Sequence, residues 1–303
     1  MAKARAIVKR RKAVRNIRKI TKTMQMIATA KFQKSLKRAV GTKPYTLKVR
    51  ELVRELAASV GNVEHPLLHR PTADTQTNRI ALVVITSNRG LAGAYNGSVL
   101  RRAGVFIREQ EAAGKTIDLY VAGKKGISYF NFQKRPIKQR TEAQDNPRFV
   151  DVEKLADHFI GRFTSHDIDS VHVAYMNFIS AGQQKADVLT LLPLAGVEEL
   201  STPKAGAGAA STGLHEEVIY DFMPSAQQLL DEILPLTVKS ALFQAFLDAT
   251  TSEHVARMVA MKSATDAADK VVRSLTMKYN RARQSQITTE LSEIMGGVEA
   301  MKG

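Results

Sequence analysis

The sequence contains no cysteine, and this absence excludes several classes of chemistry. Without thiols the chain can form no disulfide, no thiolate nucleophile and no cysteine-ligated zinc or iron–sulfur centre. Redox control through a dithiol is excluded for the same reason. The chain therefore suits a reducing or redox-indifferent compartment.

Long hydrophobic runs are also missing. Residues 80–85 form one of the longest apolar runs, far below the roughly 20 residues that span a bilayer. Met1 leads directly into basic residues rather than an apolar signal segment, so the chain is expected to stay where it is made. An organellar transit peptide is the alternative, but such segments are Ser-rich and carry no long-range apolar register.

Acidic residues are absent from the first fifty positions, while the whole chain carries a formal charge of +16 and a pI near 10.0. Such a positive potential requires a partner that tolerates it, such as nucleic acid, anionic lipid or an acidic protein surface.

The start of the chain predicts a long amphipathic helix, because no Pro or Gly occurs between residues 2 and 39. Its apolar stripe recurs at steps of three, four and seven and comprises Val14, Ile17, Met24, Ile27 and Ala28. Gly41 and Pro44 are the first expected breakers, and residues 47–60 resume the helical pattern.

The end of the chain predicts a second long helix. No Gly or Pro occurs from Leu236 to Met295, and a continuous helix of this length would measure about 90 Å. Its stripe of mostly small side chains comprises Leu242, Phe246, Ala249, Ala256, Val259, Ser263, Ala267, Val271 and Ser274. Small residues let another helix approach closely, so the N-terminal helix is the expected partner. An ordinary helix bundle is the alternative, but it would need broader aliphatic faces.

The middle of the chain changes period and predicts a compact α/β domain. Strands are expected at 79–86, 116–122, 170–178 and 186–192, with a helix over 94–113. This alternation favours a largely parallel sheet. The small-residue stretch 198–213 predicts a loop insertion.

No sequence motif predicts a catalytic, cofactor or metal site. The segment Ser87–Asn96 (SNRGLAGAYN) lies where phosphate-binding loops occur, but its glycines match neither dinucleotide nor P-loop spacing. A structural turn is the favoured interpretation. The histidines show no metal-ligand spacing, and the methionines are expected to serve helix packing or contact surfaces.

Three segments together resemble the gamma subunits of F-type ATP synthases. Residues 16–31 (NIRKITKTMQMIATAK) are similar to the family's I-T-K-A-M-x-M-V-A pattern, with Thr23 replacing its alanine. Residues 87–96 are similar to S-D-R-G-L-C-G-G-Y-N, with departures at Asn88, Ala92 and Ala94. The strongest segments are 252–261 (SEHVARMVAM) and 279–300 (YNRARQSQITTELSEIMGGVEA), which resemble I-T-x-E-x-x-E-x-x-x-G-A except at Val298.

The resemblance implies an α/β fold in which a long antiparallel coiled coil of N- and C-terminal helices carries an inserted Rossmann-like domain. The expected divisions are an N-terminal coiled-coil helix over 1–60, the α/β domain over 76–195, a flexible loop over 196–214 and a C-terminal coiled-coil helix over 225–297. It also implies a rotor shaft that couples proton-driven rotation of a membrane ring to ATP synthesis in other subunits, with no catalytic site of its own.

The family pattern implies a set of partner-binding residues. Met24 matches a position that faces the lever loop of a beta subunit, while Arg281, Arg283 and Gln284 match a polar cluster that meets loops of beta and alpha. Thr288 and Glu293 lie in the same signature. Guanidinium groups suit the acidic lever loop because they form oriented bonds with carboxylates; a solvated helix face is the alternative for both arginines.

The resemblance further implies three alpha and three beta subunits, an epsilon subunit and the c-ring as partners, with no cofactor, no nucleic acid and no direct membrane insertion. The expected location is peripheral, on the cytoplasmic side of a bacterial inner membrane. The main rival is a nucleic-acid-binding coiled-coil protein, which the charge favours but the 6% aromatic content and missing binding motifs disfavour. A nucleotide-dependent oxidoreductase is a third hypothesis, weakened by the missing fingerprint.

Overall fold

The computed structural model describes residues 2–60, 65–68, 76–194 and 226–301. Its elements are α1 (Ala2–Val60), β1 (Arg79–Ile85), α2 (Tyr95–Ala112), β2 (Thr116–Ala122), α3 (Lys124–Phe132), β3 (Gln139–Thr141), α4 (Phe149–Thr164), β4 (Ser170–Phe178), β5 (Gln184–Leu192) and α5 (Ala226–Ala300). The loop expected at 196–214 lies outside the described residues. None of the described helices combines the length and apolarity needed to cross a bilayer.

The chain divides into two compact units. The terminal unit consists of Met1–Lys31 with Val255–Gly303, and the α/β unit consists of Phe32–His254. Helices α1 and α5 contribute residues to both.

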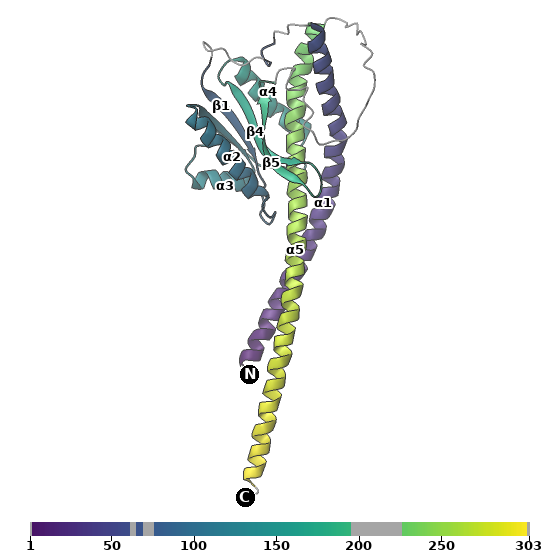
Figure 1. Cartoon of the computed structure of the whole chain (residues 1–303), viewed down its shortest axis with the longest axis vertical. Helices are drawn as coiled ribbons and strands as arrows, with labels where there is room; N and C mark the ends of the chain where they lie inside the picture. The colour runs from purple at the N-terminus through teal and green to yellow at the C-terminus, as the bar shows by residue number, and fades with distance from the viewer. Residues whose placement is uncertain (1, 61–64, 69–75, 195–225, 302–303) are drawn as a thin grey trace. The chain divides into compact units, whose positions relative to one another are not determined.

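The α/β unit is built on one five-stranded sheet in the order β3-β2-β1-β4-β5. All neighbouring strands are parallel except β4 and β5, which pair antiparallel. The expected strands and largely parallel sheet are therefore confirmed, and so is the α/β fold class with long terminal helices (Figure 1). Strand β3 and helices α3 and α4 were not predicted.

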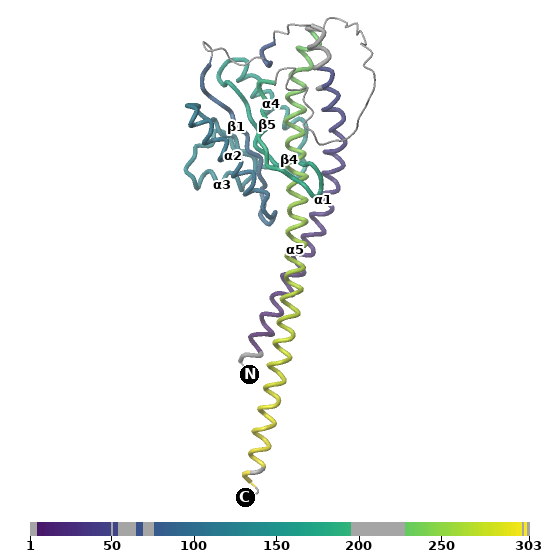
Figure 2. Tube along the Cα trace, viewed as in Figure 1, coloured from purple at the N-terminus to yellow at the C-terminus, as the bar shows by residue number. Residues whose placement is uncertain are grey.

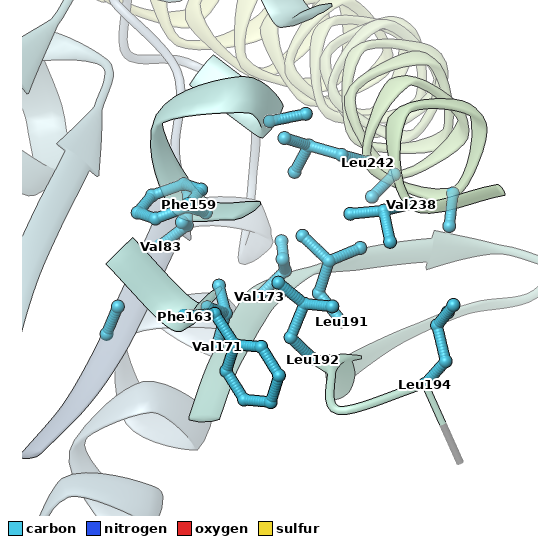
Figure 3. Close-up of a cluster of buried hydrophobic side chains, with 14 of the residues drawn as sticks. Val83, Phe159, Phe163, Val171, Val173, Leu191, Leu192, Leu194, Val238 and Leu242 are labelled. Atoms are coloured by element: carbon cyan, nitrogen blue, oxygen red, sulfur yellow. The ribbon is translucent and has the colours of Figure 1, made fainter. Parts of the chain in front are cut away.

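The main core lies on the sheet face covered by α4 and α5. Alternate residues of β1 and β4 point into it, among them Val83, Val171 and Val173, as the two-residue period of a strand requires. Phe159 of α4 and Leu242 of α5 meet them there (Figure 3). Burial of these side chains is the dominant favourable term for this unit.

An ion network ties α4 to the amino-terminal half of β2. Arg162 on α4 donates to Asp118 Oδ2 on β2 and to Asp167 Oδ2, each at 2.6 Å, and to the Tyr120 hydroxyl at 2.7 Å. Burial is the largest single influence on the pKa of Asp118 and raises it. The hydrogen bonds and charges of Lys138 and Arg162 together outweigh burial, so the pKa of Asp118 lies below its ordinary value. The network is fully paired, so its role is structural.

Neither the two expected breakers in the first helix nor a proline in the last helix interrupts helical structure. Gly41 and Pro44 lie inside α1, and Pro235 lies inside α5. A proline removes the hydrogen bond to the carbonyl four residues earlier. Those carbonyls belong to Val40 and Asp231, which are both exposed, so water can take the missing bond.

Candidate partner-binding surface

Helices α1 and α5 form an antiparallel pair in the terminal unit (Figure 2). Thr21 Oγ1 lies 2.9 Å from Thr265 Oγ1, the Arg18 guanidinium contacts the Asp269 carboxylate at 2.5 Å, and Arg11 lies 5.0 Å from the centre of the Tyr279 ring. In these three contacts the residue numbers on α1 decrease as those on α5 increase, so the two helices run antiparallel.

The covered residues of this pair follow the alternating three- and four-residue spacing of a coiled coil. On α5 they are Met261, Thr265, Ala268, Val272, Leu275, Tyr279, Ala282 and Gln286. On α1 they include Ile7, Arg11, Val14, Thr21, Gln25 and Ala28. We call these two rows the seam. Its small and hydroxyl-bearing side chains allow the backbones to approach closely.

The predicted stripes were wrong in register. On α1, Val14 and Ala28 lie in the seam, but Ile17 and Ile27 are each 53% exposed. On α5, Val259 and Val271 are likewise exposed, while Leu242 and Ala249 belong to the core of the α/β unit. Two apolar stripes lie side by side on these helices, and the less aliphatic one faces the partner helix.

The last part of α5 has no covered face. Every side chain described from Ile287 to Met301 is exposed, because the seam ends at Gln286 near the start of α1. Apolar residues nevertheless continue there at steps of four and three. We call this row the tip stripe: Ile287, Leu291, Ile294, Val298 and Met301. Ile294 is 64% exposed and Met301 is 88% exposed, so the stripe is an apolar surface available to a partner.

The charge of α5 changes sign at the tip. From Lys270 to Arg283 the helix carries basic residues and no acidic one, whereas Glu290 and Glu293 accompany the tip stripe. A partner matching this helix would present acidic groups beside the basic stretch and an apolar surface around the tip.

The predicted site residues are distributed over both helices of this unit. Arg281, Gln284 and Thr288 share one exposed face of α5, because they are three and four residues apart, and the Thr288 hydroxyl donates to the Gln284 carbonyl at 3.0 Å. Arg283 is exposed on a different face, and Glu293 is exposed beside the tip stripe. Met24 is half-buried on α1, next to the more exposed Met26.

Sequence reasoning missed the tip stripe, although its spacing is visible in residues 287–301. It also missed the exposed row on α1 that Ile17, Ile20 and Ile27 form. The signal for the tip stripe was an apolar period that continues past the start of α1, and the signal for the α1 row was a second apolar row on the same helix as the seam.

The segment Ser87–Asn96 joins β1 to α2, and its polar side chains Ser87, Asn88 and Asn96 are hydrogen-bonded within the α/β unit. The Ser87 hydroxyl and amide both reach Asn96 Oδ1 at 3.0 Å. Asn88 donates to the Ala143 carbonyl at 2.6 Å and accepts from the Lys124 amide at 3.1 Å. Across the ranges that the structure describes, no cluster of three His, Asp or Glu side chains could hold a metal ion.

Comparison with known proteins gives consistent matches over the whole chain. Residues 3–301 match the sequence model of the family described as ATP synthase. The ATP synthase gamma chain of Rhodopirellula baltica is 42% identical over 304 residues and covers 100% of both chains. That of Leptospira biflexa is 37% identical over 302 residues, covering 99% of this chain and 100% of its own.

Solved structures show the same fold at lower identity. A chain from the Euglena gracilis mitochondrial ATP synthase, in a structure of OSCP, F1 and the c-ring, has a TM-score of 0.65 at 19% identity and covers 99% of this chain and 95% of its own. A chain from the central stalk and c-ring of the Tetrahymena thermophila enzyme has a TM-score of 0.57 at 21% identity, covering 81% and 99%.

Proposed function

The chain belongs to the ATP synthase gamma chain family, and from this premise we propose that it is the rotating central shaft of a proton-translocating F-type ATP synthase. It transmits rotation to other subunits, which hold the nucleotides and carry out the chemistry.

The observation that carries this proposal is the bare tip of α5. A helix with a regular exposed apolar row is normally covered, and the described part of α1 ends before it could cover this one. An enclosing ring of alpha and beta subunits would bury the tip stripe, while acidic loops on those subunits would meet Arg281 and Arg283.

Rotation is coupled to catalysis through differential contact. At the tip and along the basic stretch, α5 presents a different side chain in each direction. Three identical subunits around it would therefore meet different surfaces at any moment. A subunit that binds one of these surfaces better in its closed state is biased towards closure. Turning the helices moves that bias from one subunit to the next.

Family membership supports, as proposals, the remaining partners and the location. We infer that the α/β unit binds the epsilon subunit and the c-ring, and that the chain is peripheral on the cytoplasmic side of a bacterial inner membrane. The proposal includes no nucleic-acid partner, no cofactor and no inserted segment.

Reconstitution with alpha and beta subunits tests the proposal. ATP hydrolysis at full rate should require all three chains, and a bead attached to the α/β unit should rotate during hydrolysis. Failure of folded chain to assemble would overturn the shaft hypothesis and favour nucleic-acid binding, whose affinity falls steeply with salt.

A pair of variants assigns assembly to the tip stripe. Leu291→Asp combined with Ile294→Asp should weaken assembly by about tenfold or more, since each places a charge in an apolar contact. Thr289→Asp, which lies outside the stripe, is the matched control. Equal effects of the two variants would show that the stripe is not the contact.

A further inference from the structure

Helices α2 and α3 cover the sheet face opposite α4 and α5, and two adjoining cavities lie along them. The first, of about 340 Å³, is lined by Gly104, Ile107, Arg108, Tyr129, Gln133 and Arg135. The second, of about 310 Å³, is lined mainly by residues of β2 and by Lys115, and it shares Ile107 and Arg135 with the first. Figure 1 shows α2 and α3 together on this side of the sheet. The combined size suits a small organic ligand.

The layer around these cavities is strongly basic. Residues 95–140 contain ten Lys and Arg but only three Asp and Glu. Two of those three acids are already paired, since Glu111 accepts both branches of Arg135 at 2.6 and 2.9 Å and Asp118 contacts Lys138. Glu109 is then the one acid of this layer left for the other eight cations.

One unpaired cation lies in each cavity. Within the described part of the chain, neither Arg108 nor Lys115 forms an ion pair. The Arg108 guanidinium lies over Gly104, where Nη1 would be 3.8 Å from an added Cβ. The absence of a side chain at Gly104 leaves the guanidinium open on the cavity side.

A neutral donor faces the same cavity. Gln133 Nε2 donates to the Tyr129 hydroxyl oxygen at 2.9 Å, so the Tyr129 proton is free to be donated elsewhere. Together Arg108 and Tyr129 offer a planar cationic fork and a hydroxyl donor, the groups that bind phosphate oxygens.

We propose that the cleft between α2 and α3 binds a phosphate-bearing anion. Arg108 and Tyr129 hold the phosphate, the Arg135–Glu111 pair forms the fixed wall between the cavities, and Lys115 with the apolar floor of Ile117 and Leu119 receives the rest of the ligand. The site differs from the Ser87–Asn96 loop, whose polar groups are already bonded. It is independent of the shaft function.

Equilibrium dialysis of the full chain with inorganic pyrophosphate at low salt tests this site. Saturable binding of one pyrophosphate per chain is expected. Arg108→Gln should weaken it by about tenfold or more, because a charge-assisted bond is lost, and Tyr129→Phe should weaken it several-fold. The matched control is Arg101→Gln, about two turns earlier on the same face of α2, where the arginine donates to the Ser98 hydroxyl instead. Binding by this variant should stay within about twofold of wild type.

A second arm separates the two sources of this chemistry. Vesicles containing phosphatidic acid are added to the chain with and without pyrophosphate. Vesicle binding that requires Arg108 and is displaced by pyrophosphate identifies a lipid headgroup as the ligand, whereas pyrophosphate binding without vesicle binding identifies a soluble phosphate. The proposal is overturned if no saturable binding occurs or if Arg101→Gln weakens binding as much as Arg108→Gln.

Discussion

Replacing Asp248 with Asn should stabilise the protein above neutral pH. Asp248 lies on α5 within the α/β unit and is only 5% exposed. Gln244 Nε2 donates a hydrogen bond to Asp248 Oδ1 at 2.8 Å, and the positive charge of Lys43 on α1 also acts on this carboxyl. Burial raises the pKa of Asp248 to about 6, against the smaller opposing effects of the Gln244 bond and the Lys43 charge.

The magnitude follows from the difference between the folded and unfolded pKa values. The ordinary pKa is 3.8 and the folded value is about 6, and each unit corresponds to about 1.4 kcal/mol. Because the folded state binds the proton more tightly, stability is greatest below pH 3.8 and falls as the pH rises through 6. Above that pH the ionised side chain costs about 3 kcal/mol.

Asparagine keeps the shape of Asp248 and cannot ionise. It also offers a donor to Gln244 Oε1, which is buried without a partner. Urea unfolding followed by circular dichroism should show Asp248→Asn to be more stable than wild type by about 2–3 kcal/mol at pH 8 and nearly equal at pH 4.

The control for this experiment is Asp266→Asn, an exposed aspartate on the same helix, which should change stability by less than about 0.5 kcal/mol at either pH. A stability difference between wild type and Asp248→Asn that is the same at pH 4 and pH 8 would refute the reasoning.

Three further experiments, with four substitutions, probe separate features. Burial, helped by the charge of Lys115, lowers the pKa of His172 from 6.5 to about 4. The neutral side chain therefore stabilises the fold fully above pH 6.5, and this contribution is lost as the pH falls through 4. The free energy of unfolding of His172→Gln should equal that of wild type at pH 8 and exceed it by about 2–3 kcal/mol near pH 4.5; equal stability of the two proteins in acid would contradict this. Leu275 lies in the seam and is 8% exposed, so Leu275→Ala should lower the free energy of unfolding by about 2–3 kcal/mol. Ile294→Ala should lower it by less than about 0.5 kcal/mol in the isolated chain. Thermal unfolding of the two variants tests this difference. Gly123→Ala should cost about 3 kcal/mol or more, because φ is 99° and the added Cβ would lie 2.1 Å from the Thr86 carbonyl oxygen; normal yield and melting temperature would count against the backbone described here.

Sequence patterns predicted the long helices and the buried strands because both carry strong periods. The three-residue β3 has only polar, exposed side chains, so no pattern marks it. Periodicity also could not choose between adjacent stripes on α1. The seam uses Thr21, whose hydroxyl meets Thr265 across the pair, and not the more aliphatic Ile20, because close approach of two helices favours small side chains.

The candidate site was harder to predict than the fold. Family resemblance pointed to Arg281, Gln284 and Thr288, and the helix brings these three onto one face, but their role stays a prediction. The exposure of the tip stripe depends on how far α5 extends beyond the first residues of α1. Only the tertiary structure shows this. The pairing of Asp118 with Arg162 likewise joins residues 44 positions apart, and no local rule relates them.

The bare tip of α5 has a consequence for amide hydrogen exchange. Its backbone hydrogen bonds are protected by helix propagation alone, since none of the other helices that the structure describes covers them. Gly296 and Gly297 each weaken the helix by about 1 kcal/mol relative to alanine. Amides beyond Gly296 should exchange orders of magnitude faster than those at Leu275, with a gradient along the intervening turns. Enclosure by other subunits would abolish that gradient, so the slowing of exchange at the tip measures the ordering free energy that assembly must supply.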